Sequence, residues 1–307
     1  MSPGGPLGLM FHYFHDGEKH PPAQGTISSA QFERIIDQVG SDAGMLSAEE
    51  WARKAESGRL GEHDVCVTFD DALRSQFDVA LPVLRRRGLT AFWFIQSGAL
   101  TGDAGQLEAF RRFRNEHFDS VEGFYQAFHA KALERKGDAV NAAVPGDYLQ
   151  AFAFYTDADR RFRFVRDRVL RPEEYAEIMQ DLMRSKNTSV KELSSGMLMD
   201  EDCLHALESE GNIIGLHSHS HPTCLADLPA DEQRAEYQTN YEVLSGILAK
   251  PPFTMAHPCN SYSGETLEIL RSLGIRIGFR ANTALRDYSC LEFPRMDSAD
   301  LVAGTKQ

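Results

Sequence analysis

Two short segments, about 150 residues apart, carry side chains of the kinds that bind metal ions. Residues 68–71 (Thr-Phe-Asp-Asp) end one apolar run, and residues 217–221 (His-Ser-His-Ser-His) end another. The adjacent carboxylates of Asp70 and Asp71 repel each other unless a cation or a shared proton stabilises them. A divalent metal ion bound by one carboxylate and two imidazoles would relieve this repulsion and leave coordination positions for water and substrate. The sequence therefore predicts a metal-dependent hydrolase.

Short apolar strands alternate with amphipathic helices along the chain, which is typical of an α/β fold. In parallel α/β folds, catalytic groups gather at the carboxyl ends of the strands. Most candidate site residues lie at or just after the end of a predicted strand, and these are His12, Asp70, Asp71, His217, His221 and His257. We predict strands over 7–13, 65–69, 90–95, 213–216, 253–256 and 275–279, and helices over 47–56, 77–87, 201–210, 231–248 and 265–273. A further helix begins at Ser28, with Gln31 at the capping-box position, and Gly88 ends the helix over 77–87.

Residues 100–198 form a different stretch, rich in Phe, Arg, Glu and Ala, with helical periodicity. Pro145-Gly146 and Arg171-Pro172 break it into about four predicted helices. We therefore expect a single catalytic domain over residues 1–307 that carries this helical insertion. The insertion covers the active site, makes a subunit contact in a homo-oligomer, or serves as a structural subdomain; its aromatic residues fit a core of its own.

The formal net charge of −13 argues against nucleic acid as the main partner. Two arginine-rich segments, 111–114 and 160–171, are local exceptions. They are either solvated helix faces or contacts for an anionic substrate such as a nucleotide-linked or lipid-linked sugar diphosphate. No apolar run is long enough to span a bilayer. The N-terminus lacks a signal-peptide pattern, and the five cysteines show no Cys-x-x-Cys spacing, so we expect a reduced, cytoplasmic protein.

The conformation of residues 217–221 decides which histidines act together. On an extended strand His217, His219 and His221 would share one face, as in a His-x-His amidohydrolase site. On a helical turn only His217 and His221 would do so. Pro222 and Gly215 indicate that the chain leaves the strand here. We therefore expect His219 to be a supporting or packing residue, with the amidohydrolase arrangement as the alternative.

The two motifs resemble those of the polysaccharide deacetylase family, the NodB-homology carbohydrate esterases. The family's Thr-Phe-Asp-Asp and His-Ser/Thr-x-x-His motifs are both intact, and the resemblance covers about two-thirds of the chain. It implies a distorted (β/α)7-type barrel with the helical insertion. It also implies that Asp71, His217 and His221 bind the metal and that Asp70 is the catalytic base. Zinc is the first choice for an aspartate and two histidines, and cobalt, nickel or iron also suit these ligands.

The family's third motif, around Arg-x-Pro-Tyr, is altered in this chain. Pro258 matches it, but Ala256 stands in place of the arginine and Cys259 in place of the aromatic residue. The missing arginine leaves open what orients Asp70. His257 lies beside the gap and is a candidate substitute, and a surface histidine is the competing interpretation.

The family's general-acid histidine, usually supplied by a late strand, is absent from the C-terminal segment. The first strand ends in Met-Phe-His, similar to the opening of family members in which that strand begins the chain. The resemblance thus implies His12 as the acid, with His15 second. Arg295 resembles a strand-end arginine of the same branch. It would contact substrate, pair with Asp297, or form a simple surface salt bridge.

These observations predict hydrolysis of the N-acetyl group of an amino sugar that is free, nucleotide-linked or lipid-linked. A surface-polysaccharide pathway, such as that of lipopolysaccharide O-antigen or capsule, is the expected setting. Hydrolysis of another C–N bond, as by a deformylase or imidase, is one alternative. A non-catalytic, metal-dependent sugar-binding protein is the other.

Overall fold

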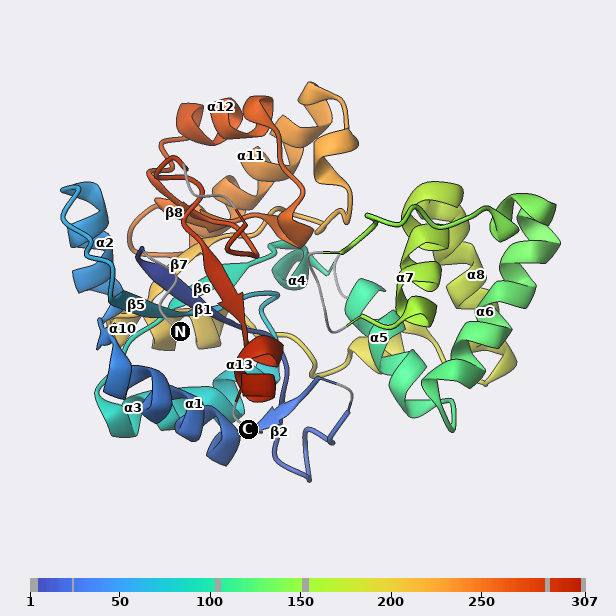
Figure 1. Cartoon of the computed structure of the whole chain (residues 1–307), viewed down its shortest axis with the longest axis horizontal. Coiled ribbons are helices and arrows are strands. Elements are labelled where there is room, and N and C mark those ends of the chain that lie inside the picture. The colour runs from blue at the N-terminus through green and yellow to red at the C-terminus, as the bar shows by residue number, and fades with distance from the viewer. Residues whose placement is uncertain (1–4, 24, 103–105, 151–154, 285–287, 305–307) are drawn as a thin grey trace. The chain divides into compact units, whose positions relative to one another are not determined.

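The computed structural model describes residues 5–23, 25–102, 106–150, 155–284 and 288–304. The chain divides into two compact units (Figure 1). The first unit joins residues 1–104 to residues 198–307, and the second consists of residues 105–197. The first unit holds the strands, whereas the described part of the second unit is helical.

The first unit is built around a parallel sheet that curves into a nearly closed seven-stranded barrel, as the predicted (β/α)7-type fold requires. Its strand order is β10-β1-β5-β6-β7-β8-β9, and the short β4 also pairs with β5. The strands are β1 (Leu7–Phe11), β4 (Gly44–Met45), β5 (Asp64–Phe69), β6 (Phe92–Ile95), β7 (Ile213–Leu216), β8 (Thr254–Ala256), β9 (Ile277–Phe279) and β10 (Arg295–Asp297). A separate parallel pair is formed by β2 (Phe14–His15) and β3 (Ile27–Ser28).

The barrel strands are buried on both faces, which explains their nearly continuous apolar sequences. All six residues of β5 are buried, and alternate side chains enter different clusters. Val65 and Val67 pack in the cluster that includes the surrounding helices. Cys66 faces the other way, into a cluster with Phe94 and Phe279. The helices therefore cover the face of the sheet that carries Val65 and Val67, and the cluster of Cys66, Phe94 and Phe279 fills the barrel interior.

The barrel closes through a short bridge between β9 and the segment that leads into β10. Phe279 pairs in parallel with Phe293, the Phe293 N–H donates to the Gly278 carbonyl at 2.8 Å, and the Arg280 N–H donates to the Phe293 carbonyl at 3.0 Å. A methyl group on Gly278 would lie 2.4 Å from the Leu291 carbonyl oxygen. Glycine at position 278 therefore permits the close approach that closes the barrel.

Helices surround the barrel close to the predicted positions. Ser28 caps the first helix with a capping box that includes Gln31, and Gly88 ends another in the left-handed conformation, as the sequence predicts. These elements are α1 (Ser29–Asp42), α2 (Ala48–Glu56), the π-helix η1 (Gln76–Ala80), α3 (Leu81–Arg87), α4 (Gly98–Thr101), α10 (Glu201–Ser209), η4 (Leu225–Asp227), α11 (Ala230–Ile247), η5 (Pro258–Asn260), α12 (Gly264–Ser272) and α13 (Ser298–Gly304).

The predicted helix over 77–87 is in fact a π-turn followed by α3. Pro82 lies in the first turn of α3 and has no N–H to donate. The Leu81 N–H instead reaches back five residues to the Gln76 carbonyl. The change of register turns the Gln76 side chain into the buried end of β5, where its amide donates to the Asp70 carbonyl at 2.6 Å.

The second unit has its own core of aromatic and aliphatic side chains. Its elements are α5 (Gln106–Glu116), α6 (Val121–Lys136), η2 (Gly137–Asn141), α7 (Asp157–Phe164), the π-helix η3 (Val165–Val169), α8 (Pro172–Ser185) and α9 (Val190–Ser194). Five α-helices therefore occupy its described part where the sequence predicted about four. Pro172 begins α8 at a position that tolerates proline, so the predicted break at Arg171-Pro172 is real.

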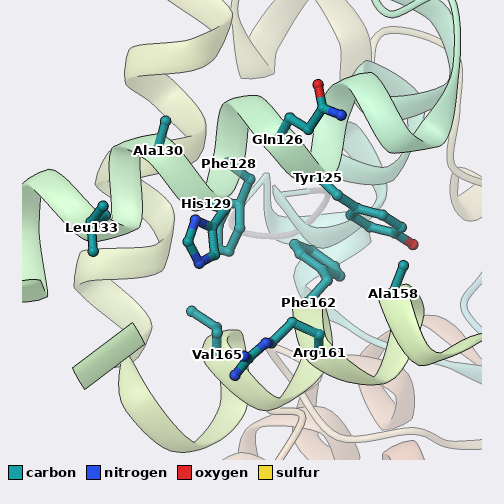
Figure 2. Close-up of a pocket in the computed structure, with 10 residues that line it drawn as sticks. All are labelled: Tyr125, Gln126, Phe128, His129, Ala130, Leu133, Ala158, Arg161, Phe162 and Val165. Carbon is teal, nitrogen blue, oxygen red and sulfur yellow. The ribbon is translucent and has the colours of Figure 1, made fainter. Parts of the chain in front are cut away.

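A pocket of about 430 Å³ opens between α6 and α7 of this unit (Figure 2). Phe128, Phe162 and Val165 line it with mainly apolar surface. Leu133, at the pocket, is the one large apolar side chain that is exposed among the residues with a described surface.

None of the described helices combines the length and the apolar character needed to cross a bilayer.

We predict that Gly278→Ala destabilises the barrel unit by about 2 kcal/mol or more, because the added methyl group overpacks the closure against rigid backbone. Gly246→Ala is the matched control, since a methyl group there meets nothing within 4 Å on α11. The control should be neutral or stabilise by about 0.5 kcal/mol. Urea unfolding measures both changes, and equal stability of the two variants would contradict this account of the closure.

Candidate functional site

The carboxyl end of β5 presents the two adjacent carboxylates inside the barrel unit. Asp70 and Asp71 are 2% and 5% exposed, respectively. Asp70 is positioned by the backbone, since its N–H donates to the Phe11 carbonyl on β1. Asp71 has a left-handed φ of 76° and follows the strand in a sharp turn. The turn separates two carboxylates that are neighbours in sequence, so they can serve different roles.

Two imidazoles from the end of β7 reach the same place as Asp71. His217 Nε2 lies 3.4 Å from Asp71 Oδ1, and His221 Nε2 lies 3.3 Å from the same oxygen. One potential ligand atom from each of these three residues lies within 4.8 Å of the others. The structure therefore brings together the three residues predicted to bind the metal.

The backbone and side chains around His217 fix the orientation of its ring. His217 Nδ1 lies 2.9 Å from the Ala256 carbonyl oxygen, so Nδ1 carries the proton and donates it to that oxygen. The ring is thereby held with Nε2 toward Asp71, and a carbonyl on the other ring nitrogen is common among metal-binding histidines. The His217 N–H donates to Asn240 Oδ1, and the Asn240 amide donates to the Ile95 carbonyl. A neighbouring strand thus holds His217 in place.

His219 takes no part in this group of ligand atoms. Its Nδ1 lies 2.9 Å from Ser97 Oγ, and its backbone N–H donates to the Glu236 carboxylate. Strand β7 ends at Leu216, and the residues after it turn rather than remain extended. The turn predicted from the sequence is therefore present, and the alternative with three histidines on one extended face is wrong.

The two motifs carry unusual backbone angles. Asp71, Ala72, Ser218 and His221 all have positive φ values between 57° and 76° without being glycine. Such angles cost free energy for non-glycine residues and persist where surrounding contacts impose them. The Glu236 carboxylate supplies such contacts, because it accepts bonds from the backbone N–H groups of residues 219 and 220. The strain therefore lies in the turns that place the candidate metal ligands.

Asp70 forms a buried, bidentate ion pair with Arg295. The two Nη atoms of Arg295 donate to the two carboxylate oxygens at 2.6 and 2.7 Å. Arg295 is fully buried, and its Nε donates to the Arg280 carbonyl. The expectations of a surface salt bridge and of a pair with Asp297 are therefore wrong. Arg295 lies where it can orient Asp70, the task left open by Ala256 in the altered third motif.

The barrel provides the space that Arg295 needs. Arg295 begins β10 and lies beside Gly8 of β1 in the sheet register. A methyl group on Gly8 would lie 2.9 Å from the Arg295 side chain. Because position 8 lacks a side chain, the guanidinium can extend past β1 toward the end of β5. It also passes 5.7 Å from the centre of the Phe94 ring, a cation–π distance.

These neighbours set the charges of the site. Burial raises the pKa of the Asp70 carboxyl, but the positive charges of Arg295 and His217 lower it by more than burial raises it. The pKa of Asp70 therefore lies below its usual value. Burial also opposes ionisation of Asp71, and His217 and His221 together lower its pKa well below the usual range. Burial lowers the pKa of His221 to about 4. Asp70 and Asp71 are therefore ionised and His221 is neutral, the forms in which carboxylates and imidazoles bind metals.

His12 extends from β1 to the same site. Its Nε2 lies 3.8 Å from Asp70 Oδ2 and 4.0 Å from Asp71 Oδ2, and its side chain is 23% exposed. It is thus more accessible than the two carboxylates and than His217 and His221, whose side chains are at most 8% exposed. His15 lies on the separate β2–β3 pair, and no described hydrogen bond or ion pair joins it to the two carboxylates. The geometry therefore favours His12 over His15.

His257 does not replace the missing arginine. Its Nε2 donates to the Leu291 carbonyl at 2.9 Å, and its ring stacks on Tyr262 at 4.0 Å. It is buried rather than on the surface, and burial lowers its pKa to about 4. Among the described contacts of His257, none is a hydrogen bond or ion pair with Asp70. The ring therefore packs the wall of the barrel beside its closure.

Sequence reasoning missed Gln76. Its side-chain amide donates to the Asp70 carbonyl at 2.6 Å and to the His12 carbonyl at 2.8 Å. It therefore joins the carboxyl ends of β1 and β5 and sets the spacing between His12 and Asp70. A glutamine at the start of a mainly apolar helix is only a weak sign of a supporting residue in a site. Gln76 is fully buried, and the π-turn directs its side chain to these carbonyls.

The ligand set fits a divalent metal ion by its chemistry. One carboxylate and two imidazoles converge, the Ala256 carbonyl holds Nδ1 of His217 so that Nε2 is the ring atom nearest Asp71, and the second carboxylate is occupied by Arg295. Nitrogen and oxygen donors of this kind suit zinc and its first-row neighbours. Asp71, His217 and His221 are therefore the residues that would hold such an ion.

We predict that the Asp70–Arg295 pair is strongly coupled in the folding free energy. Arg295→Met leaves a buried carboxylate without its partner and should cost about 3–5 kcal/mol. Asp70→Asn should also destabilise, whereas the double variant should lose much less than the sum of the two changes. Urea unfolding of the four proteins measures the coupling.

The matched control for this cycle is the exposed pair between Arg276 and Glu56, whose N–O distance is 2.7 Å. Arg276→Met should cost less than about 1 kcal/mol, because water screens this pair. Additive effects of the two site variants would contradict the coupling.

Residues 178–278 match the family model described as polysaccharide deacetylase. No curated protein sequence showed significant similarity to the chain. The deacetylase PplD of Streptococcus pyogenes has a similar structure, with a TM-score of 0.57, 16% identity, and coverage of 99% of this chain and 98% of PplD.

Two further structures share the fold. The de-N-acetylase of Aggregatibacter actinomycetemcomitans has a TM-score of 0.55 and 12% identity, and the match covers 95% of this chain and 94% of that one. IcaB of Ammonifex degensii has a TM-score of 0.56 and 16% identity, with coverage of 98% and 96%. The family model includes both histidines of the candidate metal site. Residues 178–278 therefore match this family, and the three solved structures share the fold of the chain.

Proposed function

We propose that this protein is a metal-dependent deacetylase that hydrolyses the N-acetyl group of an amino sugar. The convergence of Asp71, His217 and His221 beside the ionised Asp70 is the observation that carries this proposal. A divalent ion held by these three residues would act as a Lewis acid toward the amide carbonyl and lower the pKa of a water molecule. We propose the barrel unit as the catalytic part, because all of these residues belong to it.

Asp70 and His12 divide the proton transfers in this proposal. Asp70 accepts a proton from the attacking water, because Arg295 keeps it ionised and fixes the orientation of its carboxylate. The water oxygen then bonds to the amide carbon. His12, in its protonated form, donates a proton to the amine nitrogen as the C–N bond breaks. The products are acetate and a free amino sugar.

The substrate we propose is an amino sugar of a surface-polysaccharide pathway, such as that of lipopolysaccharide O-antigen or capsule. The deacetylase family supports a carbohydrate substrate. The odd number of cysteines and the lack of Cys-x-x-Cys spacing support a reducing, cytoplasmic location for the reaction. Zinc is the proposed metal, with cobalt, nickel and iron as the other candidates.

We predict that the wild-type protein releases acetate and free amine in equal amounts from N-acetylated amino sugars. Asp70→Asn should lower kcat about 100-fold or more, because it removes the proposed base. Asp231→Asn, in an exposed residue of α11, is the matched control and should keep full activity. Chromatography of the acid products, together with an amine assay, measures the reaction.

Other products would overturn the acetyl-specific proposal. Formate would indicate a deformylase, and a ring-opened acid would indicate an imidase. Metal-dependent sugar binding without any product, unchanged in Asp70→Asn, would indicate a binding protein.

A further inference from the structure

The pocket between α6 and α7 of the helical unit has the size and the lining of a small-molecule site. Its volume of about 430 Å³ lies within the usual range of such sites. Phe128, Phe162 and Val165 belong both to its lining and to the core of the unit, so packing holds these walls in place. Carbon atoms make up most of the lining. The pocket therefore favours a mainly apolar ligand.

The pocket is an elongated groove that follows the two helices. Its lining runs from Tyr125 to Leu133 on α6, and from Ala158 on α7 to Val165 at the start of η3. Figure 2 shows Tyr125 and Ala158 toward one end and Leu133 and Val165 toward the other. The helical rise gives each of these two stretches a length of about 10 Å. A straight, narrow ligand would thus lie along the groove.

Leu133 extends the apolar lining to the surface. It is 39% exposed, and it is the one large apolar side chain that is exposed among the residues with a described surface. A single exposed leucine is ordinary on a protein surface. Here, however, it lies at the edge of the apolar groove, where it would cover part of a ligand.

Arg161 supplies a positive charge to this apolar lining. The described lining residues include no carboxylate, and no described carboxylate forms an ion pair with Arg161. Both of its described hydrogen bonds come from Nη1, which donates to the Val140 and Ala142 carbonyls. The N–H groups of Nε and Nη2 therefore remain for an acidic group. On the opposite helix, His129 Nε2 lies 3.2 Å from Asn141 Oδ1.

The charged neighbours of Arg161 have other partners. Three cations of α6 each pair with a carboxylate, and these pairs are Lys131–Glu134, Arg135–Glu177 and Lys136–Glu174. Asp159, two residues before Arg161, accepts bonds from the hydroxyl groups of Tyr125 and Thr156. Arg161 differs from the cations of α6 because it lines the groove and has no acidic partner among the described residues. The groove is therefore complementary to an apolar molecule that carries one negative charge.

We propose that this groove binds a straight hydrocarbon chain that ends in an acidic group. The chain lies between α6 and α7, where its removal from water supplies the affinity. The acidic group accepts charge-assisted hydrogen bonds from Nε and Nη2 of Arg161, which fix the direction of the chain. The proposal is independent of the deacetylase proposal, because all of the lining residues belong to the helical unit.

Isothermal titration calorimetry of the full chain tests the ligand class with four probes, each below the concentration at which it forms micelles. Octanoate carries the chain and the charge, and it should bind wild type. Butanoate has a chain too short to fill the groove and should bind at least tenfold more weakly. Octylammonium carries the opposite charge and should also bind at least tenfold more weakly. Octanol has no charge and should fall between octanoate and octylammonium.

Variants of Arg161 separate the charge from the chain. Arg161→Gln should weaken octanoate binding at least tenfold and leave octanol binding unchanged. Arg161→Lys should bind octanoate more tightly than Arg161→Gln does, because it keeps the charge. Lys131→Gln is the matched control, since it removes one positive charge from α6 outside the lining and should bind octanoate as wild type does. Equal weakening by Lys131→Gln would overturn the proposal, because the effect would then be general electrostatics.

A variant that fills the groove tests the position of the chain. Ala158 is exposed, and Figure 2 shows its side chain pointing into the groove. Ala158→Phe should weaken octanoate and octanol binding alike, and without ligand it should unfold at the same temperature as wild type. Octanoate binding that survives Ala158→Phe would place the chain at another site, such as the candidate metal site, and would overturn the proposal.

Two further outcomes would also overturn it. One is failure of both octanoate and octanol to bind wild type. The other is a dimer, measured by sedimentation, that Ala158→Phe dissociates and octanoate does not. A second copy of the chain would then cover the groove in place of a small molecule.

Discussion

The buried contact between Asp70 and Arg295 determines how the rest of the site is arranged. Two adjacent carboxylates at the end of one strand carry more negative charge than a buried site can hold without partners. Arg295 neutralises Asp70 through both oxygens, so Asp71 alone remains for the two imidazoles. Arg295 reaches Asp70 across β1, because β10 pairs with β1 and β1 pairs with β5. Its Nε also donates to the Arg280 carbonyl, next to the bridge that closes the barrel, so one side chain joins the closure to the charges of the site.

Hydrogen bonds to the backbone hold the remaining groups at fixed positions. Gln76 joins the ends of β1 and β5, Asn240 fixes the backbone at residue 217, and Glu236 binds the turn that follows. These buried or partly buried contacts sustain the positive φ angles of Asp71 and His221. Such preorganisation suits a site that must place ligands and a base within a few ångströms before substrate arrives.

The strand ends that carry the two motifs could be predicted from the sequence, because apolar runs followed by polar residues are local signals. The capping box at Ser28 and the helix end at Gly88 were predicted for the same reason. The partner of Asp70 could not be predicted locally, since Arg295 lies 225 residues away and its side chain passes through the barrel. His257 looked like the better substitute because it adjoins Ala256 in sequence, yet its ring faces Leu291 and Tyr262. The π-turn at Gln76 depends on Pro82 and on packing, so periodicity did not indicate it.

Metal analysis of the purified protein tests the central claim most directly. Elemental analysis should find one equivalent of a divalent metal in wild type and none in His217→Ala. His219→Ala is the matched control within the same motif, because His219 contacts Ser97 rather than Asp71, and it should keep the metal. Absence of metal from wild type, or equal metal in wild type and His217→Ala, would contradict the account.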